Sequence, residues 1–134
     1  MRHTGAGLAI PDFPLSFGRV YPAEFTPAIL IHFLHRMGAF TVSLFTVILV
    51  LRIYSKNLSE LPLVIIAGIL TALISLQVMM GAMIIWFKKP VPLTTAHLAV
   101  GACCLATSVV LGLLVRTVPL GVRNTNNYQS GVVV

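Results

Sequence analysis

Two histidines, His35 and His97, stand inside runs of apolar sequence that are long enough to cross a lipid bilayer. An ionisable side chain at membrane depth is costly, so it requires a partner that hydrocarbon does not supply. One such partner is a metal cofactor held between two helices, with one imidazole from each helix. The alternative is a structural role, because a histidine in a membrane helix commonly hydrogen-bonds to a neighbouring helix.

The composition indicates an integral membrane protein. Of the 134 residues, 57% are hydrophobic and 9% are charged, and the mean hydropathy is +0.98, whereas a soluble domain carries far more charge. The net charge is +6, but the nine Lys and Arg residues form no basic stripe interleaved with aromatic side chains. We therefore expect a lipid bilayer as a partner and no nucleic acid.

Three long apolar stretches predict an all-α protein with three transmembrane helices. They lie at about 27–51, 61–86 and 93–115. With three spans, the first and third helices run in the same direction across the bilayer. His35 and His97 are therefore expected near the same membrane face and at similar depth. The basic residues that flank the spans divide almost evenly between the two sides, so they do not set the orientation.

The spans also divide the chain into segments. We expect a loop segment at 1–25, a three-helix transmembrane module at 26–116 and a polar flexible tail at 117–134. The loop segment is rich in Gly and Pro but too apolar for a solvated tail, so we predict that it lies over a membrane face. It caps the histidines if it shares their side.

Both histidines belong to helix faces of small and polar residues, which should contact protein or a ligand and not lipid. The face in the first span contains His32, His35, Arg36, Ala39, Ser43 and Thr46, and that in the third contains Thr94, His97, Gly101, Cys104 and Ser108. Zinc requires three or four ligands, and no carboxylate lies in any span. Haem iron is held by two histidines, so the pattern favours haem.

Two further polar residues have open interpretations. Arg36 is either a side chain that extends to the interface or a counter-ion for a haem propionate. Gln77 in the second span either hydrogen-bonds between helices or belongs to the ligand pocket.

Four motifs occur in order along the chain: TGAGLAIPDFPL at 4–15, HFLHR at 32–36, LQVMMGA at 76–82 and AHL at 96–98. Together they resemble the haem A synthase family of cytochrome oxidase assembly enzymes, over most of residues 3–115. The resemblance implies that His35 and His97 are the axial ligands of a haem iron. It also implies an oxidoreductase that converts haem O to haem A by oxidising a ring methyl to a formyl group.

The same resemblance extends to other residues. Many family members have a glutamate three residues before the first ligand histidine, and this chain has His32 there. His32 is therefore the candidate catalytic acid or base, since its pKa is ordinarily near neutral. Arg36 is the candidate partner of a propionate. Ser16 stands about where some members have the first cysteine of a loop pair.

The resemblance covers three helices of the family's eight, so we expect an incomplete four-helix haem-binding bundle. A homo-oligomer or a complementary half would complete it. The implied cofactors are haem O as substrate, haem B and iron, and the implied partners are a haem O synthase and a quinone-type electron acceptor. The implied location is the cell membrane, with the histidines on the extracytoplasmic side. The alternatives are a b-type cytochrome-like electron carrier and an inactive partial or assembly module.

Overall fold

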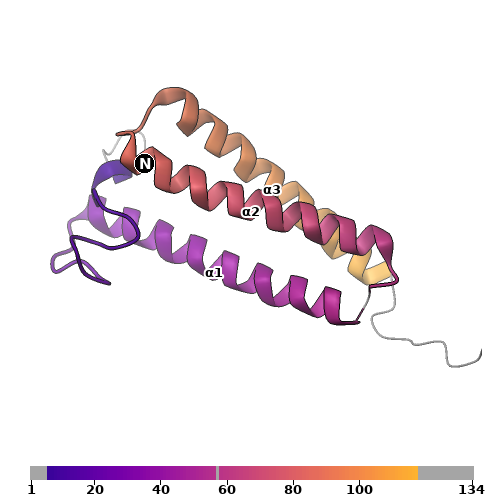
Figure 1. The fold of residues 1–134 in the computed structure, drawn as a ribbon. Helices are drawn as coiled ribbons and strands as arrows, with labels where there is room; N and C mark the ends of the chain where they lie inside the picture. Colours follow the sequence, from indigo (N-terminus) through magenta and orange to yellow (C-terminus); the bar gives the residue numbers. More distant parts are fainter. Residues whose placement is uncertain (1–5, 57, 118–134) are drawn as a thin grey trace, which may run out of the picture.

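The computed structural model describes residues 6–56 and 58–117, and the regular elements of that part are all helices, without a β-strand (Figure 1). The elements are the 3-10 helix η1 (Ala6–Leu8) and the α-helices α1 (Pro27–Lys56), α2 (Leu61–Trp86) and α3 (Val91–Thr117). The predicted fold class, all-α with three long apolar helices, is confirmed. The predicted tail beyond Thr117 lies outside the described residues.

The helices begin where the sequence supplies suitable residues. At the start of α1, Thr26 caps the helix, because its side-chain oxygen accepts the N–H of Ile29 at 3.3 Å. Pro27 occupies the first helical position, where a missing N–H costs nothing. α2 likewise has a proline in its first turn. Between α2 and α3 the chain turns through Lys88 and Lys89, which both have positive φ angles of 54° and 66°.

The three long helices lie side by side, with α2 packed against both α1 and α3. Figure 1 shows α1 and α3 running in the same direction and α2 running back between their ends. The expectation that the first and third helices share a direction is therefore confirmed. The amino-terminal segment before α1 lies at the end of the bundle where α1 and α3 begin and α2 ends.

The apolar core gathers at the other end of the bundle, which we call the packed end. Its members come from the second half of α1, the first half of α2 and the second half of α3: Val50, Ile53, Leu63, Ala67, Leu70 and Leu111. The opposite end carries His32, His35 and His97, and we call it the histidine end. The largest apolar cluster therefore closes one end of the bundle, whereas the histidine end combines polar contacts with a few buried apolar side chains, among them Ile10, Ala82 and Ile85.

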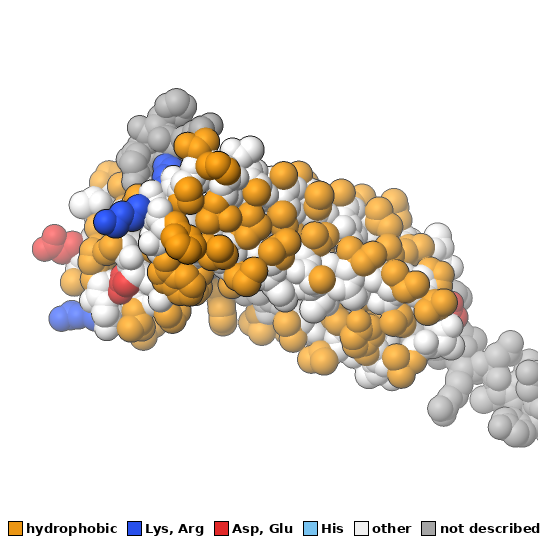
Figure 2. Space-filling model, turned by 45° about the horizontal axis from the view of Figure 1, so that its top comes forward, with side chains coloured by type: hydrophobic (Ala, Val, Ile, Leu, Met, Phe, Trp, Pro, Cys, Tyr) orange, Lys and Arg blue, Asp and Glu red, His pale blue; other side chains and the backbone are white. Residues whose placement is uncertain are grey.

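The outward surface is largely apolar. All three helices are long and apolar enough to cross a membrane, yet only 11%, 22% and 11% of the most apolar window of each is buried inside the protein. Figure 2 shows hydrophobic side chains covering most of the helical body, with charged side chains towards the ends. An apolar surface of this extent requires a hydrocarbon environment. The chain is therefore a multi-pass membrane protein.

Candidate functional site

Arg36 attaches the amino-terminal segment to α1. Its Nη1 donates to the carbonyl oxygen of Leu15 at 2.8 Å, and its Nη2 donates to the carbonyl oxygens of Ile10 and Asp12 at 3.2 and 2.6 Å. The ring of Phe13 lies 5.7 Å from the guanidinium carbon, within the range of a cation–π contact. One guanidinium thus holds several backbone groups of the segment, with the fork of donors that suits this task.

His32 is buried beneath the same segment, with 4% of its surface exposed. The backbone N–H of Ile10 lies 3.2 Å from its Nδ1, and Nε of Arg36 lies 3.3 Å from its Nε2. A neutral imidazole has a single acceptor nitrogen, so only one of these contacts is a hydrogen bond at any moment. Both neighbours are donors, and His32 therefore serves as an acceptor in the attachment. Its catalytic role stays a prediction.

Asp12 shapes a turn within the segment. Its two carboxylate oxygens accept the N–H groups of Phe17 and Gly18, each at 2.8 Å. Ser16 and Arg19 exchange backbone hydrogen bonds of 2.7 and 3.1 Å, and the two residues between them have positive φ angles of 55° and 72°. The N–H groups of Gly18 and Phe17 hold the pKa of Asp12 below its ordinary value, because they stabilise the charged carboxylate.

The segment also reaches the other helices. The ring of Phe13 meets that of Trp86, at the end of α2, edge to face at a centroid distance of 6.5 Å. A Cβ atom at Gly7 would lie 3.3 Å from Nζ of Lys89, in the connection between α2 and α3. The segment thus crosses the histidine end from α1 to the α2–α3 connection. The sequence did not single out Trp86 or Lys89 for this contact.

His97 is half-buried between α3 and α2. Its Nε2 lies 3.3 Å from Nε2 of Gln77, while its Nδ1 and Oε1 of Gln77 are buried without a hydrogen-bond partner among the described residues. Gly101 favours this close approach, because a Cβ there would lie 3.1 Å from Nε2 of Gln77. A Cβ at Gly81 would lie 3.6 Å from Cε1 of His97, which is an ordinary van der Waals contact. In this arrangement the space beside Gly101 is taken by the Gln77 side chain.

His35 is exposed although it lies on the inward face of α1. Ile53 follows it by 18 residues, which is about five helical turns, and so occupies the same face. Ile53 is only 2% exposed and belongs to the core. The face that α1 buries at the packed end is therefore open at the histidine end.

The two histidines lie at similar depth from the ends of parallel helices. His35 lies about 12 Å beyond the start of α1, and His97 lies about 9 Å beyond the start of α3. His97 also shares its helix face with Leu111, which follows it by 14 residues, or about four turns, and is buried in the core. Both histidines thus extend the core faces of their helices into the open end.

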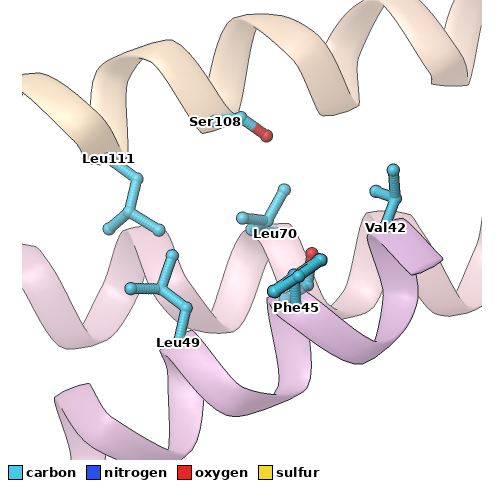
Figure 3. A pocket seen from close by; sticks show the side chains of 7 residues that line it. Val42, Phe45, Leu49, Leu70, Ser108 and Leu111 are labelled. Carbon is cyan, nitrogen blue, oxygen red and sulfur yellow. The ribbon is translucent and has the colours of Figure 1, made fainter.

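Two cavities lie deeper along the helices, and neither is lined by a histidine. The first, of about 220 Å³, is shared by all three helices (Figure 3); its lining residues are Val42, Phe45, Thr46, Leu49, Leu70, Ser108 and Leu111. The second, of about 590 Å³, lies between α1 and α2 and includes Val47, Tyr54 and Met79.

The donor set of the histidine end fits a haem. Bis-histidine ligation of haem needs one ring nitrogen from each of two histidines. His35 is exposed on an open inward face, and His97 has a buried ring nitrogen without a partner. The part of the chain that the structure describes has no group of three or more His, Cys, Asp or Glu side chains placed to hold a metal ion.

Comparisons with known proteins agree with this chemistry. Residues 1–109 match the model of a family described as cytochrome oxidase assembly protein. Curated proteins named heme A synthase from Listeria welshimeri, Listeria monocytogenes and Listeria innocua are each 34% identical to the chain over 109 residues. The match covers 78% of this chain and 34% of each relative, so the chain spans about a third of the length of those relatives. No solved structure gives a significant match.

The family match includes the segment, both histidines and the Gln77 position, and it extends over most of the chain. It therefore takes in every element of the histidine end. The chain belongs to the cytochrome oxidase assembly protein family.

Proposed function

We propose that this chain is a haem A synthase-like membrane oxidoreductase, which oxidises a ring methyl of haem O to a formyl group and so makes haem A for cytochrome oxidase. The observation that carries the proposal is the placement of His35 and His97 on the inward faces of two parallel helices, at similar depth. Family membership and the identity to proteins named heme A synthase support the reaction type.

In this function His35 and His97 would hold the haem iron, and the bound haem supplies the methyl group that is oxidised. The amino-terminal segment limits the access of lipid and water to the histidine end. Gln77 contacts His97 through the two Nε2 atoms, and because the amide nitrogen only donates, His97 would ligate the iron through Nε2 once Gln77 moves off that nitrogen. Water would supply the formyl oxygen, and a quinone-type acceptor would take up the electrons released from the methyl group.

In this structure Arg36 and His32 hold the amino-terminal segment in place. All the Arg36 contacts named above go to the segment, through backbone carbonyls and the Phe13 ring, or to His32, so Arg36 is a positioning residue in this arrangement. It would bind a propionate only by exchanging one of these carbonyls for it. His32 would serve as an acid or base once the Ile10 N–H leaves its ring.

The membrane location and the protein partners that we propose rest on the family resemblance. We place the chain in the cell membrane with the histidine end on the extracytoplasmic side. A second copy or a complementary half would cover the open faces of the helices, and a haem O synthase would supply the substrate.

The test is haem analysis in a host that makes haem O but no haem A. Membranes with the wild-type chain should contain haem A, and membranes with His35→Ala should contain none, because one axial ligand is lost. Thr41→Ala is the matched control, since Thr41 is exposed on α1 and its hydroxyl bonds only to the Met37 carbonyl. Its haem A should equal that of wild type.

Two outcomes would contradict the proposal. Protein that binds haem B alone, with no haem A formed, would indicate a b-type cytochrome-like electron carrier. Protein without a Soret band, purified from cells supplied with haem, would indicate that the histidines are structural and that the chain is an assembly module.

A further inference from the structure

The smaller cavity lies on the same helix faces as the two histidines. Thr46 and Leu49 follow His35 by 11 and 14 residues, and Ser108 and Leu111 follow His97 by the same two intervals. Steps of 11 and 14 residues are about three and four helical turns, so all four cavity residues share a face with a histidine. The cavity therefore lies about 16 to 21 Å further along both helices than the two histidines.

The cavity is mostly apolar and ends at the core. Leu70 and Leu111, which line it, are both members of the buried core at the packed end. Figure 3 shows side chains from α1, α2 and α3 converging on the space, with the Ser108 hydroxyl at one wall. That hydroxyl donates to the Cys104 carbonyl at 2.7 Å, so its proton is already engaged within α3. Apart from the Thr46 and Ser108 hydroxyls the lining is apolar, which suits an apolar chain.

The two cavities share Thr46, but most of the larger cavity lies to one side of the histidine faces. Val47, which lines it, follows His35 by 12 residues and is rotated about a third of a turn away from it. Its walls come from α1 and α2 only, so His97 has no face in common with it. A ligand that is held by both histidines and runs along their faces meets the smaller cavity.

We propose that the smaller cavity receives the isoprenoid chain of the haem that His35 and His97 hold. The inference rests on the proposed function, and it assigns to this chain the means of distinguishing haem O from haem B. Haem O carries a long apolar isoprenoid chain on its ring, and haem B carries only a vinyl group at the same position.

The selectivity arises because ligation of the iron holds the attached isoprenoid chain close to the cavity. Lipid tails are as apolar as the cavity, so burial alone gives an isoprenoid chain little reason to leave the bilayer. Once the iron is ligated, however, the chain is held near the cavity at a high effective concentration. Close contacts with three helices then add dispersion energy that haem B cannot gain.

The test compares haem O and haem B binding to the full chain in one detergent, by Soret titration. Wild type should prefer haem O by about tenfold. Ser108→Phe should fill the cavity and remove this preference while leaving haem B binding unchanged, which also shows that the variant is folded. Leu49→Phe reaches the same cavity from the α1 wall, where Leu49 lines only the smaller of the two cavities, and should reduce the preference in the same direction.

Two matched variants locate the effect. Val109→Phe places the same side chain on the 56% exposed outer face of α3, and Val47→Phe fills the larger cavity. Both should keep the wild-type preference. An absent preference in wild type, or one that Val47→Phe removes and Ser108→Phe retains, would overturn the cavity assignment alone. If wild type binds neither haem, the proposed function is wrong, and this inference, which rests on it, is wrong as well.

Discussion

The two ends of the bundle are built from different interactions, although they use the same helix faces. At the packed end, α1 contributes Val50 and Ile53 to an apolar core. At the histidine end the same face presents the exposed His35, and α1 is joined to the rest by the Arg36 contacts with the amino-terminal segment. A continuous apolar core thus makes the packed end, while at the histidine end polar contacts act together with apolar ones, such as that between Phe13 and Trp86.

The difference matters because the surrounding medium is lipid. Lipid tails contact apolar side chains about as well as other side chains do, so the packed end depends on close fit and not on removal from water. Hydrogen bonds that involve a charged group are worth more individually and are made to a few atoms. The histidine end is therefore the one that a single substitution can open.

The largest expected effect is that of Arg36→Leu. Leucine removes the donors that bind the carbonyls of Ile10, Asp12 and Leu15 and leaves the helix propensity of α1 unchanged. We expect the free energy needed to detach the segment to fall by about 3 kcal/mol, so that the detached state becomes roughly a hundredfold more populated. Limited proteolysis of the segment in intact membranes measures this change as a faster cleavage rate.

Arg52→Leu is the control for that experiment, since Arg52 is exposed at the other end of α1. Its cleavage rate should match that of wild type. Equal rates for Arg36→Leu and wild type would show that apolar contacts of the segment, and not the guanidinium, close the histidine end.

A smaller effect is expected from Leu63→Ala at the packed end. Leu63 is fully buried in the core, whereas Leu61, two residues earlier in α2, is 64% exposed. Truncation of Leu63 leaves a cavity and should lower the free energy of unfolding by about 2 kcal/mol. Leu61 faces lipid, so Leu61→Ala should change the free energy of unfolding by a few tenths of a kcal/mol or less.

Unfolding in mixed micelles with increasing denaturing detergent measures both variants. The proteolysis rate of the segment should stay at the wild-type value in Leu63→Ala, because the packed end does not contact the segment. A faster cleavage in that variant would mean that the two ends are coupled and that the comparison between them fails.

The fold was largely predictable because each helix is specified locally. Apolar runs of sufficient length, with Pro27 and Pro62 near two of the helix starts, predict three membrane helices, and three spans give α1 and α3 one direction. Helical periodicity also predicts the small and polar faces on which His35 and His97 lie. Neither prediction needed any knowledge of how the helices pack.

The contacts of the histidine end were not predictable in the same way, because they join segments far apart in sequence. Periodicity places Arg36 on a polar face, but it does not show that the guanidinium meets the carbonyls of Ile10, Asp12 and Leu15. The sequence left Gln77 between two interpretations, and the structure places its amide against His97. These partners depend on the path of an irregular segment and on the offset between α2 and α3, and neither leaves a periodic pattern.

The smallest expected effect concerns the turn that Asp12 holds. The N–H groups of Gly18 and Phe17 donate to the ionised carboxylate, which lowers its pKa in the folded turn below the ordinary value of 3.8. A group with a lowered folded pKa stabilises the fold above its unfolded pKa and loses that contribution as the pH falls through the folded pKa. The turn should therefore stay intact from neutral pH to below pH 3.8 and loosen only beneath it.

The amide NMR shifts of Phe17 and Gly18, followed through a pH titration in micelles, test this expectation. Both should change together with a midpoint below pH 3.8, and Asp12→Asn should abolish the transition because the amide does not titrate in this range. A midpoint at or above 3.8 would mean that the carboxylate is not bound by these two amides in solution. The turn would then be held by the Ser16–Arg19 backbone bonds, and the closure of the histidine end would rest on the contacts of Arg36, His32 and Phe13.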